Sequence, residues 1–281
     1  MTEHQAAMFQ LLEETDRICR KYDIRYMLFA GTLLGAVRHQ GYIPWDDDVD
    51  VIMLRPEYER FLAAAEEEID HGRFFLQKEY SEHWPMCFSK LRLQNTAAIE
   101  KYHPKDKQVH QGIYIDVFPC DNLSDHRLIR GLQFASSKVV IAKGLYKRGY
   151  ETDSIKKKMF IQLCRLLPLK PFLSATQLWK KAHTEMVHCF LGSASRYEHS
   201  VFKREWLTES TQMKFEGGIY PGSAHYDELL TQLYGDYMTP LAETERTCKI
   251  HVVIVDVHHS YLDYLEQQSD MKITTYSRSI R

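Results

Sequence analysis

Four aspartates stand close together at the start of an apolar run that ends at Leu54: Asp46, Asp47, Asp48 and Asp50. Such a run is typical of a buried strand. Because side chains alternate along a strand, Asp48 and Asp50 are expected on the same face. Two carboxylates there would repel each other and would be costly to desolvate, and a divalent cation removes that cost. Oxygen ligands of this kind favour Mg²⁺ or Mn²⁺, so the sequence predicts a metal site.

A third carboxylate, Asp116, lies inside a second apolar run, residues 112–118, which we expect to be a strand stopped by Pro119. A buried aspartate without a partner is costly. A site for two metal ions needs a further carboxylate beside Asp48 and Asp50. We therefore predict that these three aspartates are metal ligands and catalytic residues.

A phosphate-binding element is predicted next to the metal site. Gly31 and Thr32 follow a short apolar run and precede an expected helix. The first N–H groups of a helix, and the positive end of its dipole, attract phosphate. Arg38, Lys90 and Arg92 are candidates to neutralise a diphosphate.

A calcium loop is an alternative interpretation of the acidic cluster. Asp46, Asp48 and Asp50 match the first three ligand positions of an EF-hand loop. The sixth position of such a loop needs glycine for its sharp turn, but here it is occupied by Val51, and an apolar run follows. The strand interpretation is therefore favoured.

The bulk composition describes a globular protein with a real core. The chain has 281 residues, of which 44% are hydrophobic, and a net charge of −2. Six scattered cysteines without a CxxC pair argue against structural zinc. We expect a cytoplasmic protein, since we recognise neither a signal peptide nor a membrane-spanning apolar run.

Residues 125–181 carry 13 Lys/Arg against three Asp/Glu, so the middle of the chain is basic. Within it, residues 155–173 combine cationic and large apolar side chains. This segment is either a helix packed on the catalytic part with a solvated basic face, or an interfacial helix that meets an anionic membrane or a lipid-linked glycan. It lacks the interleaved aromatics of nucleic-acid stacking platforms, so no nucleic-acid partner is predicted.

The order of the expected elements indicates an α+β fold, with a small mixed sheet flanked by helices and a mostly helical additional region. Helices are expected over residues 5–22, 33–39, 57–69, 126–150, 155–167, 175–191 and 225–234. Strands are expected over residues 24–30, 74–77, 87–93 and 112–118 and in the aspartate run, with 252–257 either a strand or a helix.

The chain also resembles a known family. Residues 31–50 are a nearly unbroken match to the signature of the LicD/fukutin family. Residues 112–119 are similar to the second acidic strand of that family, and residues 220–238 resemble its C-terminal motif. The resemblance spans roughly residues 8–251. It departs at Thr239-Pro240-Leu241, where the family has paired prolines.

This resemblance implies a nucleotidyltransferase fold of the polymerase-β type. It also implies transfer of a phospho-alcohol, most often phosphocholine, from a CDP-activated donor to a hydroxyl of a glycan such as lipopolysaccharide, teichoic acid or capsule. In that scheme Asp48, Asp50 and Asp116 hold the metal, and Gly31 and Thr32 lie at the donor phosphates. Asp116 is the expected proton acceptor.

The division of the chain follows from the same resemblance. We expect a nucleotidyltransferase-like core at 1–124, a basic helical region at 125–200, the C-terminal part of the LicD-like domain at 201–266 and a polar tail at 267–281. A peripheral location at the inner face of the membrane is compatible with this division.

Two other functions stay open. The same carboxylates could serve a nucleotidylyltransferase that moves NMP from an NTP to a small alcohol, and a non-catalytic module could bind glycans through Ca²⁺. The alcohol is also open among choline, ethanolamine, glycerol and ribitol. Trp45, Trp84 and Tyr114 are candidates for an aromatic cage around a quaternary ammonium.

Overall fold

The structure is a computed structural model that describes residues 1–100, 108–177, 183–189, 200–240, 242 and 252–265. Its main feature is a curled mixed sheet in the strand order β1-β2-β6-β4-β3, with β7 paired to β6 and β8 paired to β7. The pair β2–β6 is parallel and the other pairs are antiparallel. The strands are β1 (Met27–Leu28), β2 (Asp50–Leu54), β3 (Phe74–Gln77), β4 (Ser89–Leu93), β6 (Tyr114–Asn122), β7 (Met186–His188) and β8 (Val201–Lys203).

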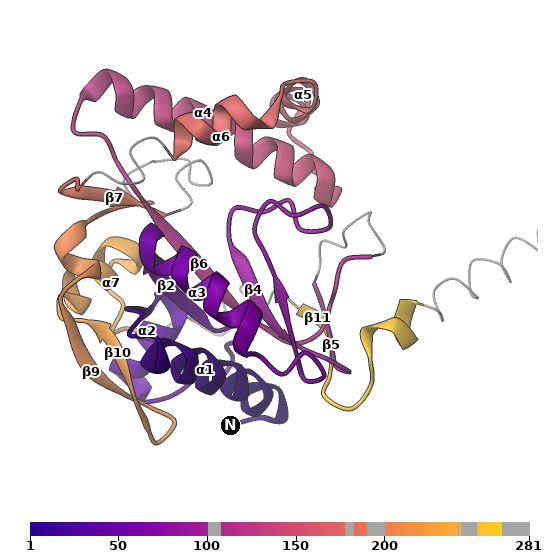
Figure 1. The fold of residues 1–281 in the computed structure, drawn as a ribbon, viewed down its shortest axis with the longest axis vertical. Helices are drawn as coiled ribbons and strands as arrows, with labels where there is room; N and C mark the ends of the chain where they lie inside the picture. The colour runs from indigo at the N-terminus through magenta and orange to yellow at the C-terminus, as the bar shows by residue number, and fades with distance from the viewer. Residues whose placement is uncertain (101–107, 178–182, 190–199, 241, 243–251, 266–281) are drawn as a thin grey trace, which may run out of the picture.

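Helices α1 (Glu3–Lys21) and α3 (Arg55–Glu68) contact each other and the central strands, and Figure 1 shows them side by side against the sheet. Helix α1 begins with a capping box, in which Thr2 and Gln5 each accept a hydrogen bond from the other's backbone N–H. The hydroxyls of Tyr58 in α3 and Ser89 in β4 lie 2.6 Å apart. Ser89 therefore points to the α1/α3 face, and Lys90 points to the opposite face.

Helices α2 (Ala30–His39) and α7 (Tyr226–Tyr234) pack with a two-stranded hairpin, β9 (Ser210–Phe215) and β10 (Gly218–Ser223). The hairpin turns through Glu216 and Gly217, both with positive φ, 48° and 80°. Such a two-residue turn matches the twist of the strands that it joins. Glu216 also accepts a hydrogen bond from the backbone N–H of Tyr42, which ties the hairpin to the loop before β2.

Helices α4 (Arg127–Arg148), α5 (Ile155–Arg165) and α6 (Leu169–Thr176) lie together at one end of the molecule, apart from the core of the sheet (Figure 1). Gly144 lets α4 approach residues 85–86, since a Cβ there would lie 2.7 Å from the carbonyl oxygen of Pro85. A separate strand pair, β5 (Ala97–Glu100) with β11 (Val252–Asp256), stands beside the main sheet.

The prediction of an α+β fold with a mixed sheet and several helices is confirmed, and most expected elements are present. Two elements were predicted wrongly. Strand β6 does not stop at Pro119 but continues to Asn122. Strand β4 pairs with β6 only as far as Val117, so beyond it the proline has no partner on that side that would need its N–H group.

The helix expected over residues 175–191 is the second error. Helix α6 ends at Thr176, and residues 186–188 form β7, which is hydrogen-bonded between β6 and β8. Tertiary pairing overrides local propensity here. The expected first strand is also shorter than its apolar run, because residues 30–32 already belong to α2.

Four further strands were missed: β5, β8 and both strands of the β9–β10 hairpin. The ambiguity over residues 252–257 is resolved as a strand, β11. The predicted polar tail, 267–281, lies outside the described residues, and the proposed division of the chain stays a prediction. None of the described helices is long and apolar enough to cross a membrane.

Candidate active site

Three charged side chains line up across the sheet. Asp50 at the start of β2 stands directly opposite Asp116 of the parallel strand β6, and Asp116 stands directly opposite Lys90 of β4. Opposed residues on neighbouring strands share a face. The row therefore lies on the face away from α1 and α3. The structure brings these three residues together as candidates, and their roles stay predictions.

Asp48 does not lie on the same strand as Asp50, contrary to expectation. Strand β2 begins at Asp50, and Asp48 belongs to the loop that precedes it. The two carboxylates are still near neighbours, and the charge of Asp48 therefore contributes to the raised pKa of Asp50.

Burial and mutual repulsion make this acidic group unfavourable in its ionised form. Burial is the main cause that raises the pKa of Asp50 well above its usual range, followed by the charges of Asp48 and Asp116. The pKa of Asp46 rises to about 8, first through burial and then through Asp48 and Asp47. Burial also raises the pKa of Asp116, while Lys90 opposes the shift. The site thus holds more negative charge than its own cations neutralise.

Lys90 is shared between two acids. Its Nζ lies 2.9 Å from an oxygen of Asp116 and 2.9 Å from an oxygen of Glu100, which also pairs with Arg148 of α4. Lys90, Arg148 and Arg92 together hold the pKa of Glu100 below its usual range although burial opposes them. Glu100 and Arg148 were not predicted, since β5 and α4 lie far from the acidic motifs in sequence.

Two of the three aromatic residues suggested for a quaternary-ammonium cage, Tyr114 and Trp84, are in contact with cations of the chain. The Nζ of Lys90 lies 3.1 Å from the ring centroid of Tyr114 and 5.3 Å from that of Trp84. The Arg148 guanidinium also lies over Trp84, at 4.9 Å. Trp45, by contrast, is half-buried against the main core.

The predicted phosphate seat lies in the first turn of α2. This helix has no side-chain hydrogen bond at its N-cap, Phe29. The hydroxyl of Thr32 accepts a hydrogen bond from the backbone N–H of Asp50 at 2.8 Å, which joins the helix start to the start of β2. Gly31 lies against Asp46, because a Cβ at Gly31 would be 2.9 Å from a carboxylate oxygen of Asp46. The acidic loop and the helix N-terminus are thus in direct contact.

Arg92 and Arg38, the two arginines predicted to neutralise a diphosphate, donate hydrogen bonds to other groups of the chain. Arg92 donates to Gln77 and to the carbonyl oxygen of Gly112, both at 2.7 Å, so its hydrogen bonds hold strands together. Arg38 donates to the carbonyl oxygen of Tyr237 at 2.7 Å. The charge of Asp46 also acts on Arg38, which lies at the margin of the acidic loop.

Tyr234, at the end of α7, is a candidate for the site that the prediction omitted. Its side chain is 45% exposed, and desolvation of its hydroxyl, followed by the charges of Asp50, Asp46 and Asp48, raises the pKa of that hydroxyl. The C-terminal motif quoted for the family resemblance contains Tyr234, so a signal for it was present in the sequence.

The acidic loop is held from two distant parts of the chain. The side-chain amide of Gln5 in α1 lies 3.4 Å from the carbonyl oxygens of Ile43 and Asp46. A carboxylate oxygen of Asp47 accepts a hydrogen bond from the backbone N–H of Val252 at 3.0 Å. Asp47 is therefore a support for the loop.

The donor set fits a divalent cation in its chemistry. The carboxylates of Asp46, Asp48, Asp50 and Asp116 lie near one another and are hard oxygen ligands. Oδ1 of Asp116 is buried and has an ion pair of 2.9 Å with Nζ of Lys90. No group of three His, Cys, Asp or Glu side chains within the described residues is already arranged as a ligand cluster, however. The charge and ligand type thus suit a metal, while the positions of the side chains are not those of a closed site.

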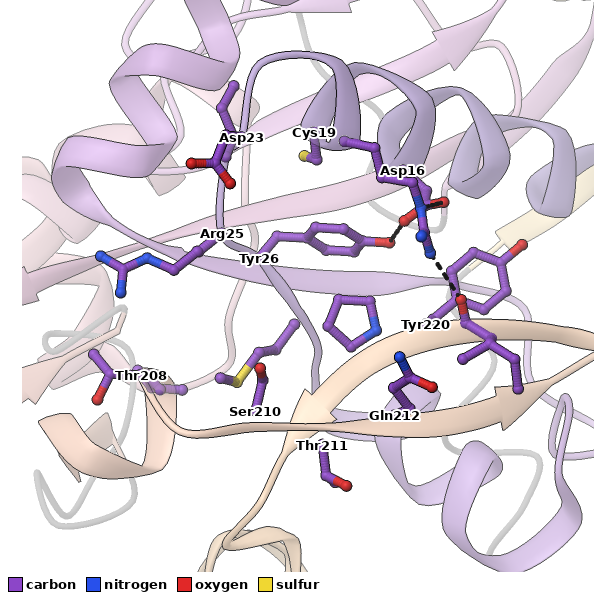
Figure 2. Close-up of a pocket in the computed structure, with 16 residues that line it drawn as sticks. Asp16, Cys19, Asp23, Arg25, Tyr26, Thr208, Ser210, Thr211, Gln212 and Tyr220 are labelled. Carbon is purple, nitrogen blue, oxygen red and sulfur yellow. Dashed lines mark hydrogen bonds and ion pairs between the residues drawn. The ribbon is translucent and has the colours of Figure 1, made fainter.

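A distinct pocket of about 830 Å³ lies between α1, β1 and the β9–β10 hairpin. Figure 2 shows Tyr26 pointing to Asp16 between α1 and the hairpin strands, and the Tyr26 hydroxyl lies 2.7 Å from that carboxylate. The pocket contains none of the predicted site residues. We place the candidate site at the Asp50–Asp116–Lys90 row, because size alone does not indicate chemistry.

Comparison with known proteins supports the resemblance. Residues 23–127 match the LicD/FKTN/FKRP nucleotidyltransferase domain family. The chain carries a LicD-family domain. This domain includes α2, the acidic loop and the strands that carry Asp50, Lys90 and Asp116.

Relatives extend the match beyond the LicD-family domain. The chain is 29% identical to the lipopolysaccharide cholinephosphotransferase LicD of Haemophilus influenzae over 250 residues, which are 85% of this chain and 91% of that protein. It is also 51% identical to an uncharacterised protein of Rickettsia prowazekii over 139 residues, 47% of this chain and 48% of that one.

Proposed function

We propose that this protein transfers a phospho-alcohol, most simply phosphocholine, from a CDP-activated donor to a hydroxyl of a cell-surface glycan. The observation that carries the proposal is the row of Asp50, Asp116 and Lys90 beside the N-terminus of α2, within a LicD-family domain. The match to a lipopolysaccharide cholinephosphotransferase over most of both chains supports the choice of cargo and acceptor. We further propose that the sheet is of the polymerase-β nucleotidyltransferase type.

In this proposal Asp48, Asp50 and Asp116 would hold Mg²⁺ or Mn²⁺, which would neutralise the donor diphosphate when bound. The backbone N–H groups of Gly31 and Thr32 would bind phosphoryl oxygens at the start of α2. Because Thr32 also binds the backbone of Asp50, the phosphate seat and the carboxylate row would keep a fixed separation.

Asp116 is the proposed proton acceptor for the acceptor hydroxyl. It reaches the site from β6, whereas Asp50 comes from β2, and a base on a separate strand can face the acceptor hydroxyl. The Lys90 ammonium would then stabilise negative charge beside it, held in position by Glu100. Arg38, at the margin of the acidic loop, would bind the donor's outer phosphate oxygens.

The test uses the full chain with Mg²⁺, purified lipopolysaccharide and a panel of CDP-alcohols, with CMP release as the readout. A label in the alcohol should appear in the glycan, and a label in the nucleotide should not. Transfer of the nucleotide label from an NTP to an alcohol would support the nucleotidylyltransferase instead. Ca²⁺-dependent glycan binding without any CMP release would support the binding module.

A matched pair of variants completes the test. Asp50→Asn should abolish CMP release, whereas Asp125→Asn, at an exposed position away from the row, should leave it unchanged. Equal activity of both variants would remove Asp50 from the proposed site.

A further inference from the structure

Helix α5 exposes large apolar side chains along one side. Ile155, Met159, Leu163 and Leu166 are exposed by 75%, 67%, 62% and 72%. Their spacing of four, four and three residues places them on one side of the helix. We call these four residues the α5 stripe. Isolated exposed apolar residues are ordinary, but a continuous row of them marks an interaction surface.

The packing of α5 on the protein does not use this stripe. Ile161 and Cys164, on another side of the helix, are buried against Ala142 and its neighbours in α4. Lys143 of α4 also donates to the carbonyl oxygen of Arg165 at 3.0 Å. The helix is therefore anchored to α4, and the stripe faces solvent from a supported element.

The charge along the stripe is mostly positive, with Glu151 and Asp153 just before its first residue. Lys156 and Lys158 flank it and form no ion pair with any residue that the structure describes. No acidic residue occurs between Ser154 and Gln177. Lys157 and Arg165 donate to the tyrosine hydroxyls of Tyr150 and Tyr146 and so keep their charge beside the stripe.

This combination selects the kind of partner. Lysine stems cover apolar surface while their ammonium groups reach polar surroundings, and an apolar stripe bordered by such residues suits the boundary between lipid headgroups and acyl chains. Anionic headgroups complement the net positive charge of residues 154–177, whereas a partner with an apolar groove would leave Lys156 and Lys158 without counter-charges. Figure 1 shows α4, α5 and α6 at one end of the molecule, where such a surface is accessible.

We propose that the α5 stripe docks on the surface of an anionic lipid bilayer, with its apolar side chains at the headgroup boundary and Lys156 and Lys158 on headgroup phosphates. The proposal concerns adsorption to the surface and is independent of the catalytic proposal, since it involves neither a nucleotide nor the carboxylate row.

The test is co-sedimentation of the full chain with vesicles of phosphatidylglycerol and phosphatidylcholine, compared with phosphatidylcholine alone. The unmodified protein should bind the anionic vesicles at low salt and dissociate at high salt. The double variant Lys156→Gln/Lys158→Gln should lose roughly fivefold in partitioning for each lysine. Met159→Gln/Leu163→Gln should lose about tenfold or more, and this loss should persist at all salt concentrations.

The matched control is Lys203→Gln/Lys214→Gln, which removes the same charge from exposed positions outside the helical layer. It should bind like the unmodified protein. An equal loss in this control, equal binding to neutral and anionic vesicles, or no binding to anionic vesicles at low salt would overturn the proposal. So would a stable dimer that Met159→Gln/Leu163→Gln dissociates, because the stripe would then be a protein interface.

Discussion

Strand β6 carries two buried aspartates that differ in how their charge is met. Asp121 accepts two hydrogen bonds of 2.7 Å from the guanidinium of Arg55, one to each carboxylate oxygen. Asp116 has a single ion pair, from its Oδ1 to Nζ of Lys90 at 2.9 Å, and it shares this lysine with Glu100. Five positions separate the two aspartates, so they point to opposite faces of the sheet, Asp121 toward α3 and Asp116 away from it.

The difference separates a structural carboxylate from one that is available for a ligand. A bidentate arginine satisfies both oxygens of Asp121 and leaves no reason for another cation to bind there. Asp116 lies with Asp50 in a group whose ionised form is unfavourable, and the protein itself supplies too little positive charge. Burial alone does not identify a functional acid, but burial without adequate compensation does.

The largest expected effect is on catalysis, at Asp50 and Asp116, whose negative charge the protein does not fully balance. Asp50→Asn should reduce CDP-alcohol turnover roughly 10³-fold, about 4 kcal/mol of transition-state stabilisation, because it removes a phosphate-neutralising ligand. Its melting temperature without metal should equal or exceed that of the unmodified protein, since one repelling charge is gone. Turnover and circular dichroism on the same preparation check both. A large loss of stability would instead make Asp50 a structural residue.

A substitution at Arg55, which balances the charge of Asp121, should reduce the stability of the fold. Arg55→Met should destabilise the fold by about 3–5 kcal/mol, because it leaves Asp121 and Glu79 buried without their shared cation. Chemical denaturation measures this loss. Arg60→Met, on the same helix but in an exposed ion pair with Glu57, is the control and should cost about 1 kcal/mol or less. Similar losses in the two variants would contradict the distinction.

The pH dependence of the stability of the metal-free protein is a further test of the unbalanced charge at Asp46 and Asp50. A carboxyl whose pKa is raised in the folded state keeps a proton that the unfolded chain has released above about pH 4. The stability of the chelator-treated protein should therefore fall as the pH rises toward the pKa of Asp46, about 8. Thermal melts across this range should show a shallower fall for Asp50→Asn. A slope identical to that of the unmodified protein would contradict the prediction.

The smallest effect is expected for a carboxylate that has many partners but is only partly buried at the surface. Glu68 accepts hydrogen bonds from Lys21 and Tyr22, and these lower its pKa to about 2. Solvent screens such contacts, so Glu68→Gln should leave the melting temperature near that of the unmodified protein. Thermal denaturation at moderate salt is the check. A loss comparable to that of Arg55→Met would show that the number of partners matters more than burial.

The sequence indicated that the acids lie together, but only Asp50 and Asp116 are buried, and Asp48 precedes the strand that it was expected to share with Asp50. The sequence did not reveal how their charge is met. Alternation and apolar runs predicted the strands that carry Asp50, Lys90 and Asp116, because these signals are local. The partners of Lys90 depend on β5 and α4, and the pairing of Asp121 depends on how α3 leaves β2. Such contacts are set by tertiary packing and leave no local pattern.

The errors in the fold have the same origin. A proline usually ends a strand, but the pairing of β4 with β6 has already ended at Val117, so Pro119 does not interrupt it. Residues 186–188 form a strand because β6 and β8 lie on either side of them. The hairpin around Gly217 was missed although its two-residue turn is a local signal, because β10 contains Pro221 and Gly222, two residue types that usually interrupt a strand.

The two attachments of the acidic loop have a consequence for how the protein is made. Gln5 is synthesised before the loop, but the N–H group that binds Asp47 belongs to Val252. A ribosome that has produced the whole LicD-family domain, residues 23–127, has therefore not yet supplied one of the supports of its acidic loop. The nascent chain must keep four closely spaced carboxylates without this support until residue 252 emerges, so the loop reaches its final form late in translation.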